Sequence, residues 1–193
     1  MKKLDILFID SGLSISSIEN VFSDELNLTV FNFSSIIRKE IQNKSDLSIE
    51  IRSFLESGKV LSKELIEKMI IKHVKEINGD LILSRYPRSS KEFLELEKIL
   101  LNENIIINKI WFFKLRNYQD FMRKHFENPL NKKYLEKYGN EIIDNWLNKF
   151  KHTRVNIDNI KSVISNIEWK NIEMDYSEKP NFEFIRELII NSA

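Results

Sequence analysis

Short apolar runs alternate with longer amphipathic segments along this chain. Such alternation is typical of βαβ units, in which helices join the strands of a parallel sheet. The runs that predict strands are 4–9, 28–31, 80–83, 108–113 and 171–174. We therefore predict a three-layer α/β fold around a central parallel sheet of about five strands.

Between these runs, apolar residues recur at the three- and four-residue spacing of helices that bury one face. The predicted helices span 14–26, 34–43, 47–57, 89 or 90 to about 101, 118–126, 134–150, 157–167 and 182–190, and a further helix begins at Ser62. Ser62 is a suitable N-cap, Gly58 a suitable helix end, and Pro129 a helix breaker.

Composition narrows the possible partners and compartments. The chain has 193 residues and a formal net charge of +1, so we expect one domain over 1–193 and no broad nucleic-acid or membrane-binding surface. It has no cysteine, and its three histidines lack metal-ligand spacing, so we expect no metal site. Asp5 and Asp10 interrupt the first apolar run, which we interpret as a strand and not as a signal peptide. We expect a cytoplasmic protein.

Three segments, in order, resemble the motifs of adenylate kinases and related nucleoside monophosphate kinases. They read FNFSSIIRKEI, ESGKVLSKELIEKMI and LILSRYPRSSKEF. The family motifs are close to S-T-G-D-x-L-R, G-x-L-V-P and D-G-[YF]-P-R. The residues that match are Arg38, Gly58, Val60, Glu64, Tyr86, Pro87 and Arg88. The resemblance implies a P-loop-NTPase-like fold.

In that family the two matched arginines hold the phosphate of the acceptor monophosphate. Guanidinium is always charged and offers a planar fork to phosphate oxygens. The resemblance therefore makes Arg38, Arg88 and the adjacent Arg85 candidate acceptor-phosphate ligands. The plainer interpretation is that Arg38 is a solvated helix residue and Arg88 a surface charge at a helix start.

The donor side lacks the phosphate loop, G-x-x-x-x-G-K-[ST]. The first predicted strand runs into DSGLSISS, and neither register of the motif finds a lysine. Asp10 and Ile15 fall on the two glycine positions, and Ser16 falls on the lysine. A β-branched side chain resists positive φ, and a carboxylate repels phosphate. The predicted degenerate donor loop comprises Asp10, Gly12, Ile15, Ser16 and Ser17.

Other family positions have also changed. Ser84 and Arg85 replace the Asp-Gly of the third motif, which weakens support for Mg²⁺. Arg123 stands where the first lid arginine is expected and is the one candidate catalytic residue, while Glu127 stands where another arginine is common. Arg116 and Arg154 are alternative lid cations.

Glu92 replaces the glutamine that reads the base in that family. Ionised glutamate only accepts hydrogen bonds, so it suits the donor-rich edge of guanine better than adenine. The alternative is that Glu92 is an exposed helix residue. The stretch 128–154, with Tyr134, Tyr138, Trp146 and Phe150, is either a helical insertion or an altered lid; amphipathic helices with aromatic core anchors are the plainer interpretation.

Three functions remain open. The first is a degenerate adenylate-kinase-like protein that binds a nucleoside monophosphate or similar phosphorylated ligand with little or no phosphoryl transfer. The second is an active but divergent nucleoside monophosphate kinase, for which alone ATP and Mg²⁺ are implied. The third is a non-catalytic scaffold that binds a protein partner.

Overall fold

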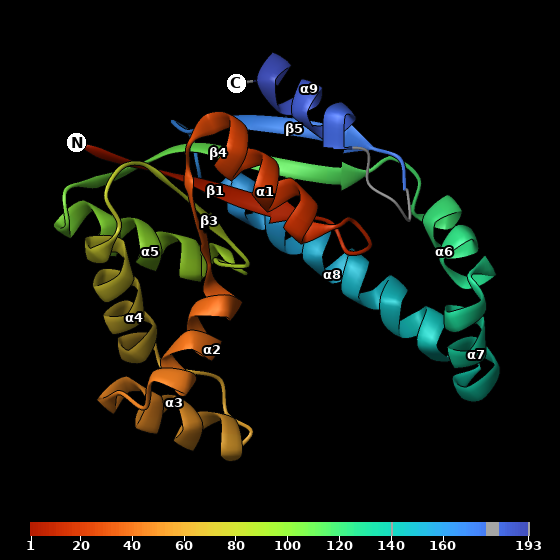
Figure 1. Cartoon of the computed structure of the whole chain (residues 1–193), viewed down its shortest axis with the longest axis horizontal. Helices are drawn as coiled ribbons and strands as arrows, with labels where there is room; N and C mark the ends of the chain where they lie inside the picture. The colour runs from red at the N-terminus through yellow and green to blue at the C-terminus, as the bar shows by residue number, and fades with distance from the viewer. Residues whose placement is uncertain (140, 177–181, 193) are drawn as a thin grey trace.

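The computed structural model describes residues 1–139, 141–176 and 182–192. Its centre is a five-stranded parallel sheet in the order β2-β3-β1-β4-β5 (Figure 1). The strands are β1 (Lys2–Ile9), β2 (Thr29–Asn32), β3 (Leu81–Ser84), β4 (Ile105–Leu115) and β5 (Glu168–Met174). The predicted α/β fold is thereby confirmed, and the strand order is typical of the P-loop nucleoside monophosphate kinase fold.

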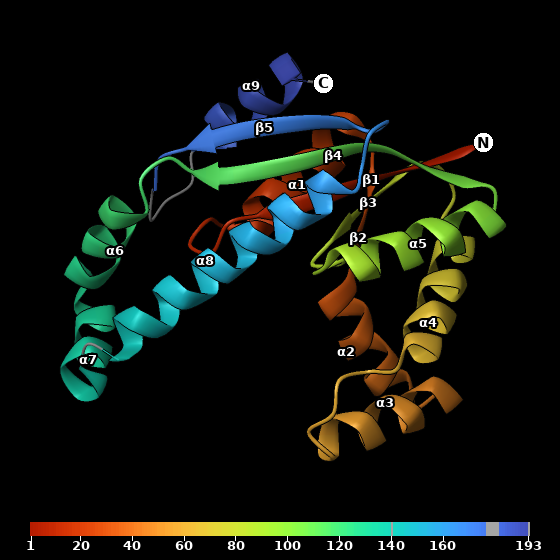
Figure 2. The same ribbon diagram turned by 180° about the vertical axis from the view of Figure 1, so that it is seen from behind.

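Helices cover both faces of the sheet, which gives three layers. Alternate residues of β1 point to opposite faces: Leu4, Ile6 and Phe8 enter one core, and Leu7 enters the other. The core around Leu7 is closed by α1 (Ile15–Leu26) and α9 (Phe182–Ser192). On the opposite face lie α5 (Ser90–Asn102) and α8 (Glu141–Ser162), which are seen in front of the sheet in Figure 2.

Three helices project from the β2–β3 side of the sheet: α2 (Phe33–Asn43), α3 (Asp46–Glu56) and α4 (Lys63–Glu76) (Figure 1). A buried carboxylate ties them together, because Glu40 binds Nε2 of His73 at 2.7 Å, Nζ of Lys72 at 2.8 Å and the hydroxyl of Ser45 at 2.8 Å. The predicted N-cap is confirmed, since the Ser62 side chain accepts a hydrogen bond from the backbone N–H of Leu65.

The segment after β4 differs from the prediction. It forms α6 (Tyr118–Glu127), α7 (Pro129–Tyr138) and the long α8. The predicted pair of helices at 134–150 and 157–167 is wrong, because α8 runs unbroken from Glu141 to Ser162. Residues 151–156 contain no proline or glycine to end it, and Ile157 and Ile160 bury its last turns against the sheet.

Aromatic side chains anchor this segment. Trp146 packs against Phe121 with ring centroids 5.7 Å apart, and Phe150 stacks on Tyr118 at 3.9 Å. The predicted anchors Tyr134 and Tyr138 lie in α7, but their side chains are outside the described part of the structure. In the described ranges, no helix is long and apolar enough to cross a membrane.

Candidate functional site

A cavity of about 990 Å³ opens at the carboxyl ends of β1 and β3. One wall is the end of β1 and the loop that follows it, residues 7–13 and 15. The second wall is the connection from β3 to α5, and the third is one face of α8. Open parallel sheets place ligands at this edge, so the cavity is the candidate site.

Two of the three predicted phosphate-binding arginines line this cavity. Arg85 and Arg88 are both exposed, and in the described ranges neither guanidinium forms an ion pair. Arg85 has φ of +65°, in the left-handed region that glycine prefers, and it occupies the glycine position of the family motif. Arg38 lies elsewhere on α2, where it donates to the Ser35 hydroxyl at 3.2 Å, and it is not part of the described lining.

The carboxylate of Asp10 forms an ion pair and hydrogen bonds with other groups of the protein. Its side chain is fully buried and accepts hydrogen bonds from Nε of Arg154 at 3.1 Å and from the backbone N–H of Leu115 at 2.9 Å. Nη2 of Arg154 binds the same carboxylate and also the Leu115 carbonyl, at 2.9 Å. Burial raises the pKa of Asp10, and the hydrogen bonds from Arg154 and Leu115 oppose that rise. The repulsion expected at this position is therefore offset by Arg154.

The other residues of the loop after β1 differ in their surroundings. Gly12 has φ of +102°, and a Cβ there would lie 2.6 Å from the buried ring of Phe121. Ile15 faces the cavity, whereas Ser17 is buried and its hydroxyl lies 2.7 Å from that of Ser14. Ser16, at the lysine position of the motif, is exposed and lies outside the described lining.

A carboxylate that sequence reasoning missed lies at the end of β3. The buried Ser84 hydroxyl donates to Oε1 of Glu19 in α1, and Nδ2 of Asn32 donates to the same oxygen at 2.7 Å. This joins α1 to the ends of β2 and β3. The sequence contained no signal for the contact, because Glu19 and Ser84 are far apart in the chain.

Glu92 caps α5. Its carboxylate accepts a hydrogen bond from the backbone N–H of Arg88 at 2.6 Å, while the Ser89 hydroxyl accepts one from the N–H of Glu92 at 3.2 Å. This reciprocal arrangement is close to a capping box. It favours a structural role for Glu92 and fixes the position from which Arg88 extends.

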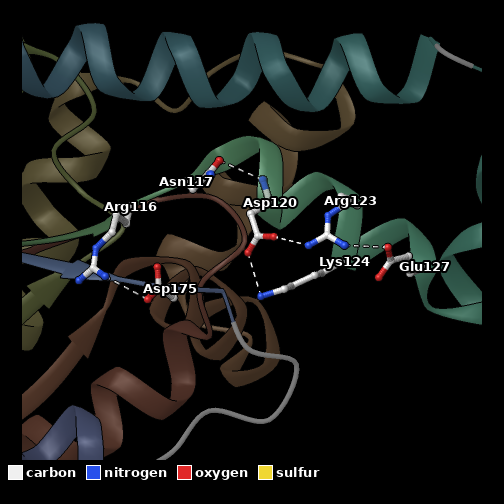
Figure 3. A network of polar contacts seen from close by, with 7 residues as sticks. All are labelled: Arg116, Asn117, Asp120, Arg123, Lys124, Glu127 and Asp175. Atoms are coloured by element: carbon white, nitrogen blue, oxygen red, sulfur yellow. Dashed lines mark hydrogen bonds and ion pairs between the residues drawn. The ribbon is translucent and has the colours of Figure 1, made fainter.

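Arg123 takes part in a network of ion pairs on α6 (Figure 3). Nη2 lies 2.6 Å from Asp120, and Nη1 lies 3.2 Å from Glu127. Lys124 binds the other oxygen of Asp120 at 2.8 Å. Arg116, drawn in the same view, pairs with Asp175 at 3.2 Å. Neither arginine contributes to the described lining of the cavity.

The face of α8 toward the cavity supplies polar residues that sequence reasoning missed. They are Asn145, Asn148, Lys149, His152, Thr153 and Asn156. Their three- and four-residue spacing is that of one helix face, but the predicted helix break at 151–156 divided the pattern. No cluster of three or more histidine, aspartate or glutamate side chains able to hold a metal ion occurs in the described ranges.

Comparisons with known proteins place this site in an evolutionary context. No protein-family model matches the chain. The chain is 27% identical over 100 residues to an adenylate kinase of Thermococcus gammatolerans, covering 52% of this chain and 45% of that protein. It is 28% identical over 85 residues to one of Campylobacter lari, covering 44% and 45%. For one of Mesomycoplasma hyopneumoniae, identity is 24% over 115 residues, covering 58% of this chain and 52% of that protein.

The chain thus spans about half the length of the curated relatives it matches. Together with the sheet order, this makes the chain a distant homologue of the adenylate kinases.

Proposed function

We propose that this adenylate-kinase-related protein binds a nucleoside monophosphate or a similar phosphorylated ligand, with little or no phosphoryl transfer. The observation that carries the proposal is the pair Arg85 and Arg88 in the cavity at the end of β3. Neither side chain has an ion-pair partner among the described residues, so both are available to a phosphate.

The loop after β1 supports the second part of the proposal. A phosphate loop brings a lysine and several backbone N–H groups to the transferred phosphate. Here no lysine is present between Asp10 and Ser17. The ring of Phe121 packs on Gly12, and Ile15 projects into the cavity. These features support the proposal that the loop holds a triphosphate poorly.

The proposal is tested by titrating the protein with adenosine and guanosine monophosphates in calorimetry. Charge-assisted hydrogen bonds contribute about 1.5–3 kcal/mol each, so Arg88→Ala should weaken binding about tenfold or more while the melting temperature without ligand stays unchanged. Lys98→Ala is the matched control, because Lys98 is exposed on α5 and lies outside the described lining. If Arg88→Ala leaves the affinity unchanged, the assignment of this arginine is wrong.

An active but divergent kinase is the second candidate. Lys149 lines the cavity from α8, so a cation is present near the site although the loop lacks one. Steady-state ADP formation with ATP, Mg²⁺ and a panel of monophosphates separates the two candidates. Robust turnover by the unmodified protein would replace our leading proposal. We further propose a cytoplasmic location, since a chain without cysteine fits a reducing compartment.

A further inference from the structure

The α8 wall of the cavity carries a cation that no other part of the described structure uses. Lys149 is exposed and lines the cavity, and its ammonium makes no ion pair with any described residue. Arg154, one turn and a half further along α8, is instead committed to Asp10. The two cations of α8 therefore have different roles. Arg154 binds the loop after β1, whereas Lys149 remains available to a ligand.

His152 stands one helical turn after Lys149 and also lines the cavity. Its Nδ1 lies 3.1 Å from the side-chain nitrogen of Asn156. An amide nitrogen only donates, so this contact is a hydrogen bond in the tautomer of His152 whose Nδ1 accepts, and in that tautomer Nε2 carries the ring hydrogen. In that tautomer His152 offers an N–H donor on the same wall of the cavity as Lys149.

The distribution of charge around the cavity is uneven. Its basic side chains are Arg85 and Arg88 on one wall and Lys149 on another, and Asp10 is the single acid of the described lining. Because Asp10 is neutralised by Arg154, the cavity has an excess of positive charge in a chain whose formal net charge is only +1. Positive groups on two separate walls suit a ligand with two separate anionic groups.

We propose that Lys149 and His152 form a second anion subsite, so that the cavity favours phosphorylated ligands with a second phosphate. This inference rests on the proposed function, in which Arg85 and Arg88 hold the first phosphate. The second phosphate binds to α8, because the loop after β1 contains no lysine and its Gly12 is packed against Phe121.

The test compares adenosine and guanosine 5′-monophosphates with the corresponding 3′,5′-bisphosphates and 5′-diphosphates in calorimetry. In the unmodified protein, at least one doubly phosphorylated probe should bind about tenfold or more tightly than its monophosphate. Lys149→Gln should abolish that gain and weaken monophosphate binding far less than it weakens binding of the doubly phosphorylated probe. His152→Ala should reduce the gain, and His152→Gln should restore part of it, because the amide supplies a donor.

Lys151→Gln is the matched control. Lys151 is exposed on the same helix, carries the same charge and lies outside the described lining, so its loss should leave the gain intact. The inference is overturned if the second phosphate adds no affinity, or if Lys149→Gln retains the gain. Tight binding of doubly phosphorylated probes that depends on Lys149 but not on Arg88 would support the α8 subsite while refuting the proposed function. If no probe binds, both fail.

Discussion

The ends of β1 and β3 lie side by side at one edge of the sheet, since Leu7 pairs with Ser84, yet they differ in how their charge is used. After β1, Asp10 is buried against Arg154, and the ring of Phe121 packs against Gly12. After β3, Arg85 extends into the cavity from a left-handed backbone position without an ion-pair partner among the described residues. The first end satisfies its own charge, whereas the second leaves charge for a ligand. We therefore expect an anionic ligand to bind at the end of β3, where the charge of Arg85 has no ion-pair partner among the described residues.

The largest expected effect comes from breaking the closed end. Arg154→Ala leaves the buried carboxylate of Asp10 without its cation, and uncompensated buried charges cost about 3 kcal/mol or more. Denaturant unfolding should show this loss. Arg116→Ala is the control, because Arg116 and Asp175 form an exposed pair worth about 1 kcal/mol or less. Equal losses in the two variants would contradict a structural role for the Asp10–Arg154 pair.

The same variant has a predictable pH dependence. Burial raises the pKa of Asp10, and removing Arg154 takes away an interaction that lowers it. A carboxyl group whose pKa is raised in the folded state favours folding in its protonated form. That contribution to the free energy of unfolding is lost as pH rises through the folded-state pKa. The stability lost in Arg154→Ala should therefore grow as pH rises from about 4 toward neutrality.

Gly12→Ala tests the contact between the loop after β1 and the ring of Phe121. The new Cβ would lie 2.6 Å from the ring of Phe121, at a φ of +102° that L-residues rarely adopt. We expect a loss of about 2 kcal/mol in the free energy of unfolding, from overpacking and backbone strain together. Gly58→Ala is the matched control, since Gly58 also has positive φ but nothing lies within 4 Å of its added Cβ. A smaller loss at Gly12 than at Gly58 would show that Phe121 moves aside freely.

Arg85→Gly probes the open end. Glycine relieves the left-handed backbone position, so we expect stability to rise by up to about 1 kcal/mol, partly offset by the greater freedom of glycine in the unfolded chain. Monophosphate affinity should fall at the same time. Lys44→Gly, at a φ of +51° after α2 and outside the described lining, should gain similar stability and leave affinity unchanged. Unaltered affinity in Arg85→Gly would remove Arg85 from the site.

The smallest effect is expected from restoring one motif residue. Ser16 is exposed and lies outside the described lining, so Ser16→Lys should change stability by less than about 0.5 kcal/mol and give no ADP formation. A fuller rebuild adds Asp10→Gly, Ile15→Gly and Ser84→Asp. Within this set, Asp10→Gly removes the partner of Arg154, so a loss of stability should accompany any turnover. Turnover by Ser16→Lys alone would show that the loop is closer to functional than its packing indicates.

Local patterns were enough to predict the sheet and most helices. The short apolar run of β1 and the helical periodicity after it are properties of short segments, and the third motif located Arg88 after a buried strand. Strand ends were less predictable. β1 begins at Lys2 and β4 at Ile105, earlier than the predicted starts at 4 and 108, and backbone pairing between the two strands accompanies both extensions.

Only the tertiary structure decided how the site residues are used. The sequence shows an aspartate in the loop after β1, but its charge is neutralised by Arg154, 144 residues away. It shows a glutamate at the position of a base-reading glutamine, but Glu92 binds the backbone of Arg88. The sequence places Lys149 in a predicted helix, but only the fold shows that this residue lines the cavity. Charges act over a few ångströms of space and not along the chain, so which of them stay free for a ligand is settled only when the fold brings their partners together.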